Sequence, residues 1–136
     1  MPFLISNLCI NLELWQTTTN HYIMDRIEKY SSLIVRLLEE YASVKPANLD
    51  QQEYQIMADN TRNHFQLISM GWQKERFFYN VILHLDIKEN GKIWLQVNNT
   101  DWNIADTLIE NGVLITDIVL GFISPNMRKF SNYAVA

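Results

Sequence analysis

Residues 76–97 decide the fold, and they read Arg-Phe-Phe-Tyr-Asn-Val-Ile-Leu-His-Leu-Asp-Ile-Lys-Glu-Asn-Gly-Lys-Ile-Trp-Leu-Gln-Val. From Arg76 to Lys88 the pattern has a period of two, which is typical of a β-strand with one buried face. The face predicted to meet the core carries Phe77, Tyr79, Val81, Leu83, Leu85 and Ile87. The other face carries Phe78, Asn80, Ile82, His84, Asp86 and Lys88. Glu89-Asn90-Gly91 then predicts a turn into a hairpin.

The hydrophobic pattern also selects the length of this hairpin loop. A two-residue loop at Asn90-Gly91 would place Leu85 opposite Gln96, and so pair apolar residues with amides on the buried face. A three-residue loop with Gly91 in the left-handed conformation shifts the register by one residue, and every side chain changes face. We therefore predict the three-residue loop, with the pairs Ile87–Ile93, Leu85–Leu95 and Leu83–Val97.

A helix and two further strands are predicted before the hairpin. Apolar residues of the helix recur at helical spacing and define one buried stripe: Ile27, Tyr30, Ile34, Leu37, Leu38 and Tyr41. The helix runs from Met24 to Tyr41 and must end before Pro46, because the residue before a proline avoids the α region. The period then changes to two, which predicts strands over 54–59 and about 64–72.

A second helix and a short C-terminal segment complete the prediction. Asn99-Thr100-Asp101 offers a cap to a helix that ends at Asn111-Gly112, and a short apolar run follows at 118–122. The expected class is α+β: an N-terminal helix, a four-stranded antiparallel meander, a second helix and the C-terminal segment. The helices are expected mainly on one face of the sheet.

Residues 1–23 differ from the rest of the chain. All 11 lysines and arginines lie at Arg26 or later, while the single cysteine is Cys9. The segment lacks the positive region of a secretory signal, and Ser6, Asn7 and Asn11 interrupt its apolar run. Alternation over 10–14 predicts a short strand, and the threonines at 17–19 predict a break. We interpret 1–23 as an upstream extension or a loosely packed arm, and 24–136 as a single domain.

Composition excludes several classes of function. The 136 residues are 48% hydrophobic and carry 11 basic and 15 acidic side chains, for a net charge of −4. DNA binding draws most of its affinity from Lys and Arg, so direct DNA binding is disfavoured. One cysteine excludes an internal disulfide and a cysteine-based zinc site. No run is long enough to span a bilayer, so no membrane contact is expected. These features are typical of a cytoplasmic protein, and no cofactor is predicted.

Two groups of residues could carry chemistry. Asp86 and Lys88 share one face near the end of the third strand, and Asp59 closes the first strand; a carboxylate pair with a nearby lysine is typical of Mg²⁺-dependent nucleases. The alternative is that these residues are the ordinary polar side of a two-faced strand. Simple alternation places His64 and His84 on opposite faces, so we predict no metal site formed by the two imidazoles.

Apolar side chains are expected on the face of the sheet away from the first helix. The predicted register places Trp94 opposite Asp86 there, with Trp72, Phe65, Leu67, Phe78 and Ile82 nearby. Either the C-terminal segment covers this face, or a second copy or another protein does. The residues we predict for partner binding are Trp72, His84, Trp94 and Arg128.

Several stretches together resemble one known family. They are Met-Asp-Arg-Ile-Glu-Lys-Tyr at 24–30, Leu-His-Leu-Asp-Ile-Lys at 83–88, Gly-Lys-Ile-Trp-Leu-Gln at 91–96 and Asp-Ile-Val-Leu-Gly-Phe at 117–122. With Gly71-Trp72, Ser124-Pro125 and Arg128, this pattern resembles the XisI family, the fdxN element excision controlling factors. The chain departs from the family at Ile123, where family members often have histidine.

The resemblance implies a role and a partner. It implies a cytoplasmic accessory protein that controls programmed excision of a DNA element without itself being an enzyme. It also implies an XisH-like partner with a nuclease fold, so that the chain contacts DNA only indirectly. A homo-oligomer is the alternative assembly, and the family supplies no catalytic residues to carry over. The alternative from another class is the metal-dependent nuclease that uses Asp59, Asp86 and Lys88.

Overall fold

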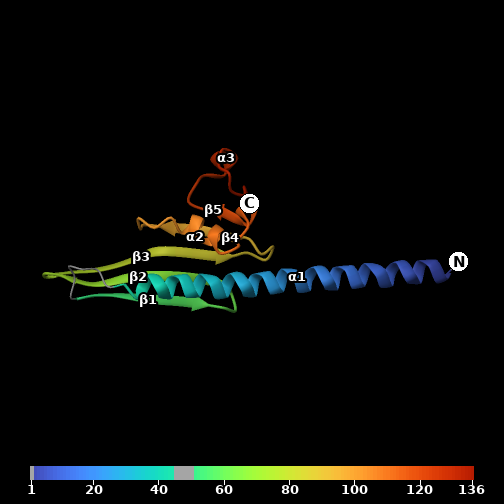
Figure 1. Ribbon diagram of the computed structural model, residues 1–136, viewed down its shortest axis with the longest axis horizontal. Coiled ribbons are helices and arrows are strands. Elements are labelled where there is room, and N and C mark those ends of the chain that lie inside the picture. The colour runs from blue at the N-terminus through green and yellow to red at the C-terminus, as the bar shows by residue number, and fades with distance from the viewer. Residues whose placement is uncertain (1, 45–50) are drawn as a thin grey trace.

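The computed structural model describes the backbone of residues 2–44 and 51–136, and the side chains from residue 18 onward within those ranges. A long helix comes first, then a sheet in which the short helix α2 lies between the last two strands and the short helix α3 follows them (Figure 1). The elements are α1 (Pro2–Ala42), β1 (Gln52–Asp59), β2 (His64–Gln73), β3 (Arg76–Ile87), β4 (Ile93–Asn98), α2 (Ile104–Glu110), a 3-10 turn (Ile115–Asp117), β5 (Ile118–Leu120) and α3 (Pro125–Arg128).

The first helix is longer than the sequence predicted. The expected strand at 10–14 and the break at 17–19 are wrong, because α1 runs without interruption from Pro2 to Ala42. No glycine or proline occurs between residues 3 and 45. Each threonine costs a helix only a few tenths of a kcal/mol, and adding a residue to an existing helix avoids the cost of nucleation. The polar stretch is therefore too weak a signal to stop the helix.

The sheet has five strands rather than four, in the order β1-β2-β3-β4-β5. Strands β1 to β4 form the predicted antiparallel meander. The fifth strand, β5, pairs in parallel with β4 through Ile93–Ile118, Trp94–Val119 and Leu95–Leu120. Its three residues are too few to show a period, and its partner strand is distant in sequence. The predicted α+β class is correct, and the description as four antiparallel strands is corrected to a mixed sheet.

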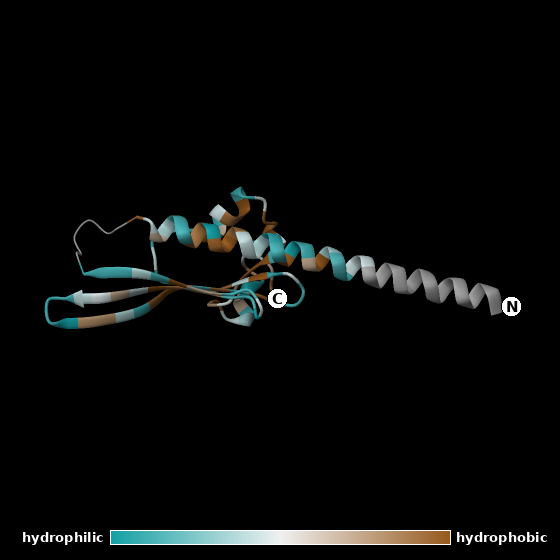
Figure 2. Cartoon of the chain, turned by 90° about the horizontal axis from the view of Figure 1, so that it is seen from below, coloured by the Kyte–Doolittle hydropathy of each residue, from teal (hydrophilic) through white to brown (hydrophobic). Residues whose placement is uncertain are grey.

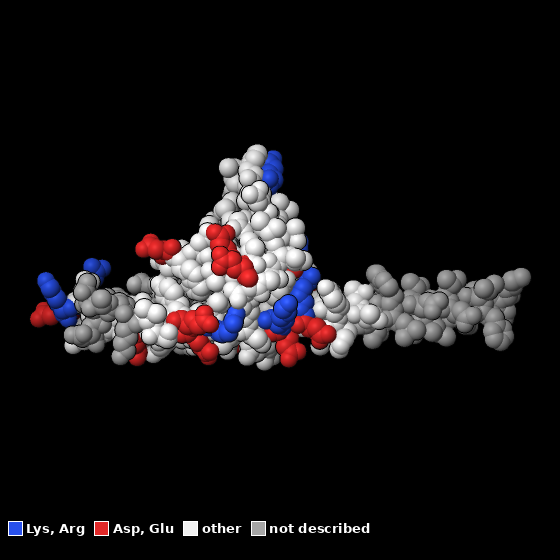
Figure 3. Space-filling model, viewed as in Figure 1, with Lys and Arg blue, Asp and Glu red and all other residues white. Residues whose placement is uncertain are grey.

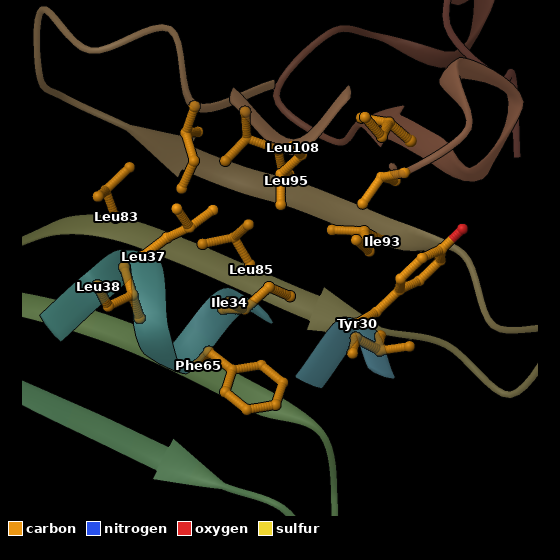
Figure 4. Packing of buried hydrophobic residues seen from close by; sticks show 14 of the residues in the cluster. Tyr30, Ile34, Leu37, Leu38, Phe65, Leu83, Leu85, Ile93, Leu95 and Leu108 are labelled. Atoms are coloured by element: carbon orange, nitrogen blue, oxygen red, sulfur yellow. The ribbon is translucent and has the colours of Figure 1, made fainter. Parts of the chain in front are cut away.

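One hydrophobic core lies between the helices and a single face of the sheet. Tyr30, Ile34, Leu37 and Leu38 of α1 meet strand residues such as Phe65 and Leu85 (Figure 4). Ile104 and Leu108 of α2 belong to the same cluster, so α1 and α2 cover the same face, as predicted. Figure 2 shows α1 lying along this face, with strongly hydrophobic residues in the part over the strands. We call the opposite face of the sheet the outer face.

Two β-bulges change which side chains reach the outer face. In the β2–β3 ladder Leu67 pairs with Leu83 but Ile68 pairs with Val81, so Ile82 is an extra residue. A bulge inverts the alternation beyond it. The prediction that Phe77 and Tyr79 face the core is therefore wrong: they are 47% and 54% exposed, whereas Ile82 packs against the core.

The second bulge lies in the predicted hairpin. The three-residue loop is confirmed, with Gly91 at φ +82°, and so are the pairs Ile87–Ile93 and Leu85–Leu95. Beyond them Gln96 is an extra residue, so Val97 pairs with His84, and Leu83 pairs with Asn98 instead of Val97. Alternation alone does not predict a bulge, because the pattern on either side of it still looks regular.

A buried polar contact joins α1 to the end of the sheet. The Tyr30 hydroxyl donates a 2.7 Å hydrogen bond to Asp117 Oδ2, and the Arg26 guanidinium lies 3.7 Å from the same oxygen. Burial, together with the hydrogen bond to Asp117, raises the pKa of Tyr30 to about 12. Arg26 also donates to the carbonyl of Asn90 in the hairpin loop. These bonds fix the position of α1 against β5 and the hairpin.

Candidate functional site

The outer face of the sheet carries polar side chains near the β3–β4 turn and aromatic ones near the β2–β3 turn. One row across the strands is formed by successive partners: Asp59, His64, Asp86 and Trp94. The next row contains Met57, Gln66 and His84. Because paired residues in antiparallel strands have their side chains on the same face, each row gathers groups far apart in sequence. We call His64, Gln66, His84, Asp86 and Gln96 the polar cluster.

Asp86 is the centre of the polar cluster. Its Oδ1 accepts hydrogen bonds from His64 Nδ1 at 2.7 Å and from His84 Nε2 at 2.9 Å. Its Oδ2 accepts a 3.2 Å bond from Gln96 Nε2, and Gln66 Nε2 donates to His84 Nδ1 at 2.9 Å. The prediction that His64 and His84 lie on opposite faces is thus wrong. Their places follow from the register, which puts His64 beside Asp86 and Gln66 beside His84.

Burial and hydrogen bonding act in opposite directions on the Asp86 carboxyl. Its side chain is only 10% exposed, and burial alone would raise its pKa. The hydrogen bonds from His64, His84 and Gln96 outweigh burial and hold the pKa of Asp86 below its usual range. Asp86 is therefore a carboxylate at neutral pH, a strong acceptor held in a fixed place.

The structure does not bring together the three residues of the predicted nuclease site. The Cα atoms of Asp59 and Asp86 lie about 10 Å apart, because β2 runs between the two strands that carry them. Its carboxylate instead accepts from the backbone of Thr61 and Arg62 and pairs with the Arg62 side chain, and these contacts lower its pKa. Lys88 places its ammonium 5.5 Å from the Trp94 ring centroid. Asp59 is thus held in its own turn and is not part of the group formed by His64, His84 and Asp86.

The C-terminal segment covers the Trp94 end of the outer face. The Arg128 guanidinium lies 4.9 Å from the Trp94 ring centroid, and Arg128 Nε donates to the carbonyl of Ile123 at 2.9 Å. Gly121 allows a close approach, since a Cβ there would lie 2.2 Å from Gln96 Oε1. Of the predicted partner-binding residues, Trp94 and Arg128 therefore contact each other, and His84 lies in the neighbouring row of the same face. Their contacts, however, are largely within the chain.

The fourth predicted partner-binding residue, Trp72, lies elsewhere. Trp72 pairs with Phe77, which lies nine residues before Asp86 on β3. Because Asp86 is the cross-strand partner of Trp94, the two tryptophans are roughly 25–30 Å apart. The Trp72 and Phe77 rings lie 5.1 Å apart, and the two side chains are 49% and 47% exposed. Tyr79 follows on the same face at 54%. Trp72, Phe77 and Tyr79 form an exposed aromatic surface that we call the hairpin patch.

Other residues expected beside Trp94 have different positions. Phe65 and Leu67 are fully buried in the core on the opposite face, which corrects that prediction. The expected pairing of Trp94 with Asp86 is confirmed. The prediction of C-terminal coverage holds at the Trp94 end only, because the hairpin patch stays exposed.

The side of the molecule drawn in Figure 3 gives no indication of a phosphate-binding face. On the side drawn in Figure 3, acidic and basic side chains are interspersed, and no continuous basic band appears. Electrostatic binding to a nucleic acid backbone depends on clustered Lys and Arg. Among the described residues, no helix is both long enough and apolar enough to cross a membrane.

Comparisons with known proteins identify the family. The family model described as XisI protein matches residues 24–135. The chain belongs to the XisI family. A solved XisI-like protein from Anabaena variabilis shares 43% identity and a TM-score of 0.74, over 81% of this chain and 99% of that one. A second structure, the fdxN element excision controlling factor XisI from the same organism, shares 28% identity and a TM-score of 0.70, over 82% and 99%. No curated protein matches.

In this XisI-family chain, the sequence pattern indicated Asp86, His84 and Trp94 as candidate residues. It did not predict the hydrogen bonds that join Asp86 to His64 and His84. It assigned no role to Gln66 or Gln96, whose amides complete the polar cluster. The available signal was the pairing of β2 with β3. Counting back from the turn at 74–75 places Gln66 near His84, but only with the bulge at Ile82 included.

Proposed function

We propose that this chain is a non-enzymatic control factor for excision of a DNA element, and that it acts in the cytoplasm by binding an XisH-like partner with a nuclease fold. Membership of the XisI family supports the role, since one similar structure is named as an excision controlling factor. The observation that carries the binding mechanism is the exposed hairpin patch, because a protein that acts by binding needs a surface of this kind.

The size and chemistry of the hairpin patch suit a protein partner. Three aromatic side chains of roughly 200 Å² each, about half exposed, present roughly 300 Å² of contact surface. This is the size at which an exposed apolar patch on a monomer is commonly functional. Tryptophan and tyrosine are also enriched among the residues that dominate binding energy. Because Trp72 and Phe77 contact each other, the patch is partly ordered before binding.

The charge of the chain favours a basic partner over DNA itself. A net charge of −4 repels the phosphate backbone. A DNA-handling partner carries basic surface, and opposite charge accelerates and orients such an encounter. The basic residues Lys74 and Arg76 at the turn beside the patch can pair with acidic side chains of the same partner. In this proposal nuclease chemistry belongs to the partner, which agrees with the separation of Asp59 from Asp86.

Co-expression with the XisH-like partner followed by size-exclusion chromatography tests the proposal. We expect co-elution at micromolar concentration, and two separate peaks would contradict it. The double variant Trp72→Ala/Phe77→Ala should weaken binding at least about 30-fold, as loss of a dominant aromatic contact does. Phe130→Ala is the matched control, since Phe130 is 74% exposed but lies outside the patch.

The same experiment distinguishes other occupants of the patch. If the chain alone elutes as a dimer that Trp72→Ala/Phe77→Ala converts to a monomer, the patch binds a second copy and the proposed partner contact is refuted. If the isolated chain shifts a DNA probe with strong salt dependence, the chain binds DNA directly and the indirect mechanism is wrong.

A further inference from the structure

We propose that His64, His84 and Asp86 form a binding site for one divalent transition metal ion, with Zn²⁺ as its simplest occupant. Among the described residues they are the one group of three such side chains whose ligand atoms all lie within 4.8 Å of one another. Two imidazoles and one carboxylate are a recurrent set for zinc and non-haem iron, often with a further position left open. This inference does not depend on the proposed function.

The distances within the group leave room for an ion after small side-chain rotations. The two nitrogens lie 2.7 and 2.9 Å from Asp86 Oδ1. Ligands bound to zinc at 2.0–2.1 Å in a tetrahedron lie about 3.3 Å apart, so each contact must widen by about 0.5 Å. His64 can make this adjustment because its side chain is 53% exposed. The exposure also leaves one side of the site open to water.

The surroundings provide the outer partners that metal ligands require. A metal-bound histidine usually donates its second N–H to a fixed acceptor, which sets the ring orientation. Gln66 contacts the Nδ1 of His84 at 2.9 Å, and its amide can present oxygen instead of nitrogen by a simple flip. Gln96 holds the second oxygen of Asp86 at 3.2 Å. Gly121 gives Gln96 its space, since any side chain there would meet the amide.

The donor set also decides which metals fit. Mg²⁺ and Ca²⁺ prefer sites made of oxygen ligands, and only Asp86 supplies an oxygen here. Imidazole nitrogens suit Zn²⁺, Co²⁺, Ni²⁺ and Fe²⁺. The site therefore differs from the carboxylate pair considered for a nuclease, both in its residues and in the ion it selects.

Titration of the full chain with Co²⁺ and Zn²⁺ tests the inference. We expect one saturable site, with visible Co²⁺ absorption bands that Zn²⁺ removes by displacement. His64→Ala should lower affinity at least about 100-fold, and Gln66→Ala about 10-fold or more, as loss of an outer partner does. His64→Ala removes an exposed side chain, so circular dichroism should show an unchanged fold.

The matched control is His21→Ala. His21 lies on α1 and is paired with Asp25 at 3.4 Å. The variant therefore removes one histidine that lies outside the site. Its Co²⁺ spectrum and affinity should equal those of the unaltered chain. Absence of saturable binding overturns the inference, and so does equal binding by the double variant His64→Ala/His84→Ala. An effect of His21→Ala as large as that of His64→Ala would likewise refute it, because it would locate binding elsewhere.

Discussion

Replacement of Asp86 by asparagine tests the physical account of the polar cluster. The carboxylate accepts three hydrogen bonds, at 2.7, 2.9 and 3.2 Å, in a position that is 10% exposed. Asp86→Asn keeps the shape and one oxygen acceptor but removes the negative charge. It also places an amide N–H₂ where Gln96 now donates, so that bond survives only if Gln96 turns its amide over.

The expected cost follows from those contacts. A hydrogen bond to a charged group contributes about 1.5–3 kcal/mol, against about 1 kcal/mol for a neutral one. Two bonds lose their charge assistance, but the one to His64 is discounted because that side chain is 53% exposed. We therefore expect the free energy of unfolding to fall by about 1–2 kcal/mol at pH 7. With a slope of roughly 2 kcal/mol per molar urea, the midpoint should fall by about 0.5–1 M.

The pH dependence makes the prediction specific. Because the folded pKa of Asp86 is lowered from 3.8, its stabilising contribution is present above that value and is lost as pH falls through the folded pKa. The difference between the two proteins should be complete at pH 5–7 and should shrink below pH 4. Urea unfolding followed by circular dichroism, in the presence of a metal chelator, measures it at each pH.

Asp59→Asn provides the control for this comparison. Asp59 is a half-buried carboxyl whose turn bonds an asparagine oxygen can also accept, so Asp59→Asn loses only the surface pairing with Arg62 and its urea midpoint should fall by less than that of Asp86→Asn. The reasoning is refuted if Asp86→Asn unfolds at the same urea concentration as the unaltered chain at pH 7. It is also refuted if the difference persists undiminished at the lowest pH at which both proteins fold.

Three further predictions concern the fold. Leu85→Ala removes a fully buried core side chain and should cost about 2–5 kcal/mol, measured by urea unfolding; a cost below 1 kcal/mol would contradict the packing described. Gly91→Ala should lower the free energy of unfolding by about 1–2 kcal/mol from its φ of +82° alone. The loss should exceed that of Gly112→Ala, because only at Gly91 does the added Cβ lie 2.6 Å from the Arg26 side chain. The pKa of Tyr30 is raised to about 12 in the fold, so its protonated hydroxyl stabilises the folded state fully below pH 10, and this contribution is lost as the pH rises to 12. Tyr30→Phe should therefore flatten the decline in the free energy of unfolding over that range. Parallel declines for the two proteins would disprove it.

The sequence predicted the features that depend on local pattern. Helix α1 near Tyr30–Leu38, the meander and the Gly91 loop follow from hydrophobic period and turn chemistry, and all are present. The pairs Ile87–Ile93 and Leu85–Leu95 were predicted because a slip of one residue would bury amides. The three residues of β5 show no period, and their partner strand becomes visible only in the folded sheet.

The polar cluster could not be predicted from alternation because bulges reset it. Counting by twos along β3 placed Phe77 and Ile82 on the wrong faces, since the extra residue at Ile82 reverses the order. Counting within one strand also says nothing about the register between strands, which sets the contact of His64 with Asp86. The contacts of the candidate site therefore depend on how the strands pair, which the sequence pattern of each strand alone does not predict.

Excision of the DNA element in cells that lack this chain tests the central claim most directly. The host must carry the element and its recombinase, and the excised junction is quantified after complementation with the unaltered chain or with variants. We predict that Phe130→Ala restores control of excision, while Trp72→Ala/Phe77→Ala behaves like the deletion although it folds and accumulates. Full restoration by Trp72→Ala/Phe77→Ala would contradict control through the hairpin patch.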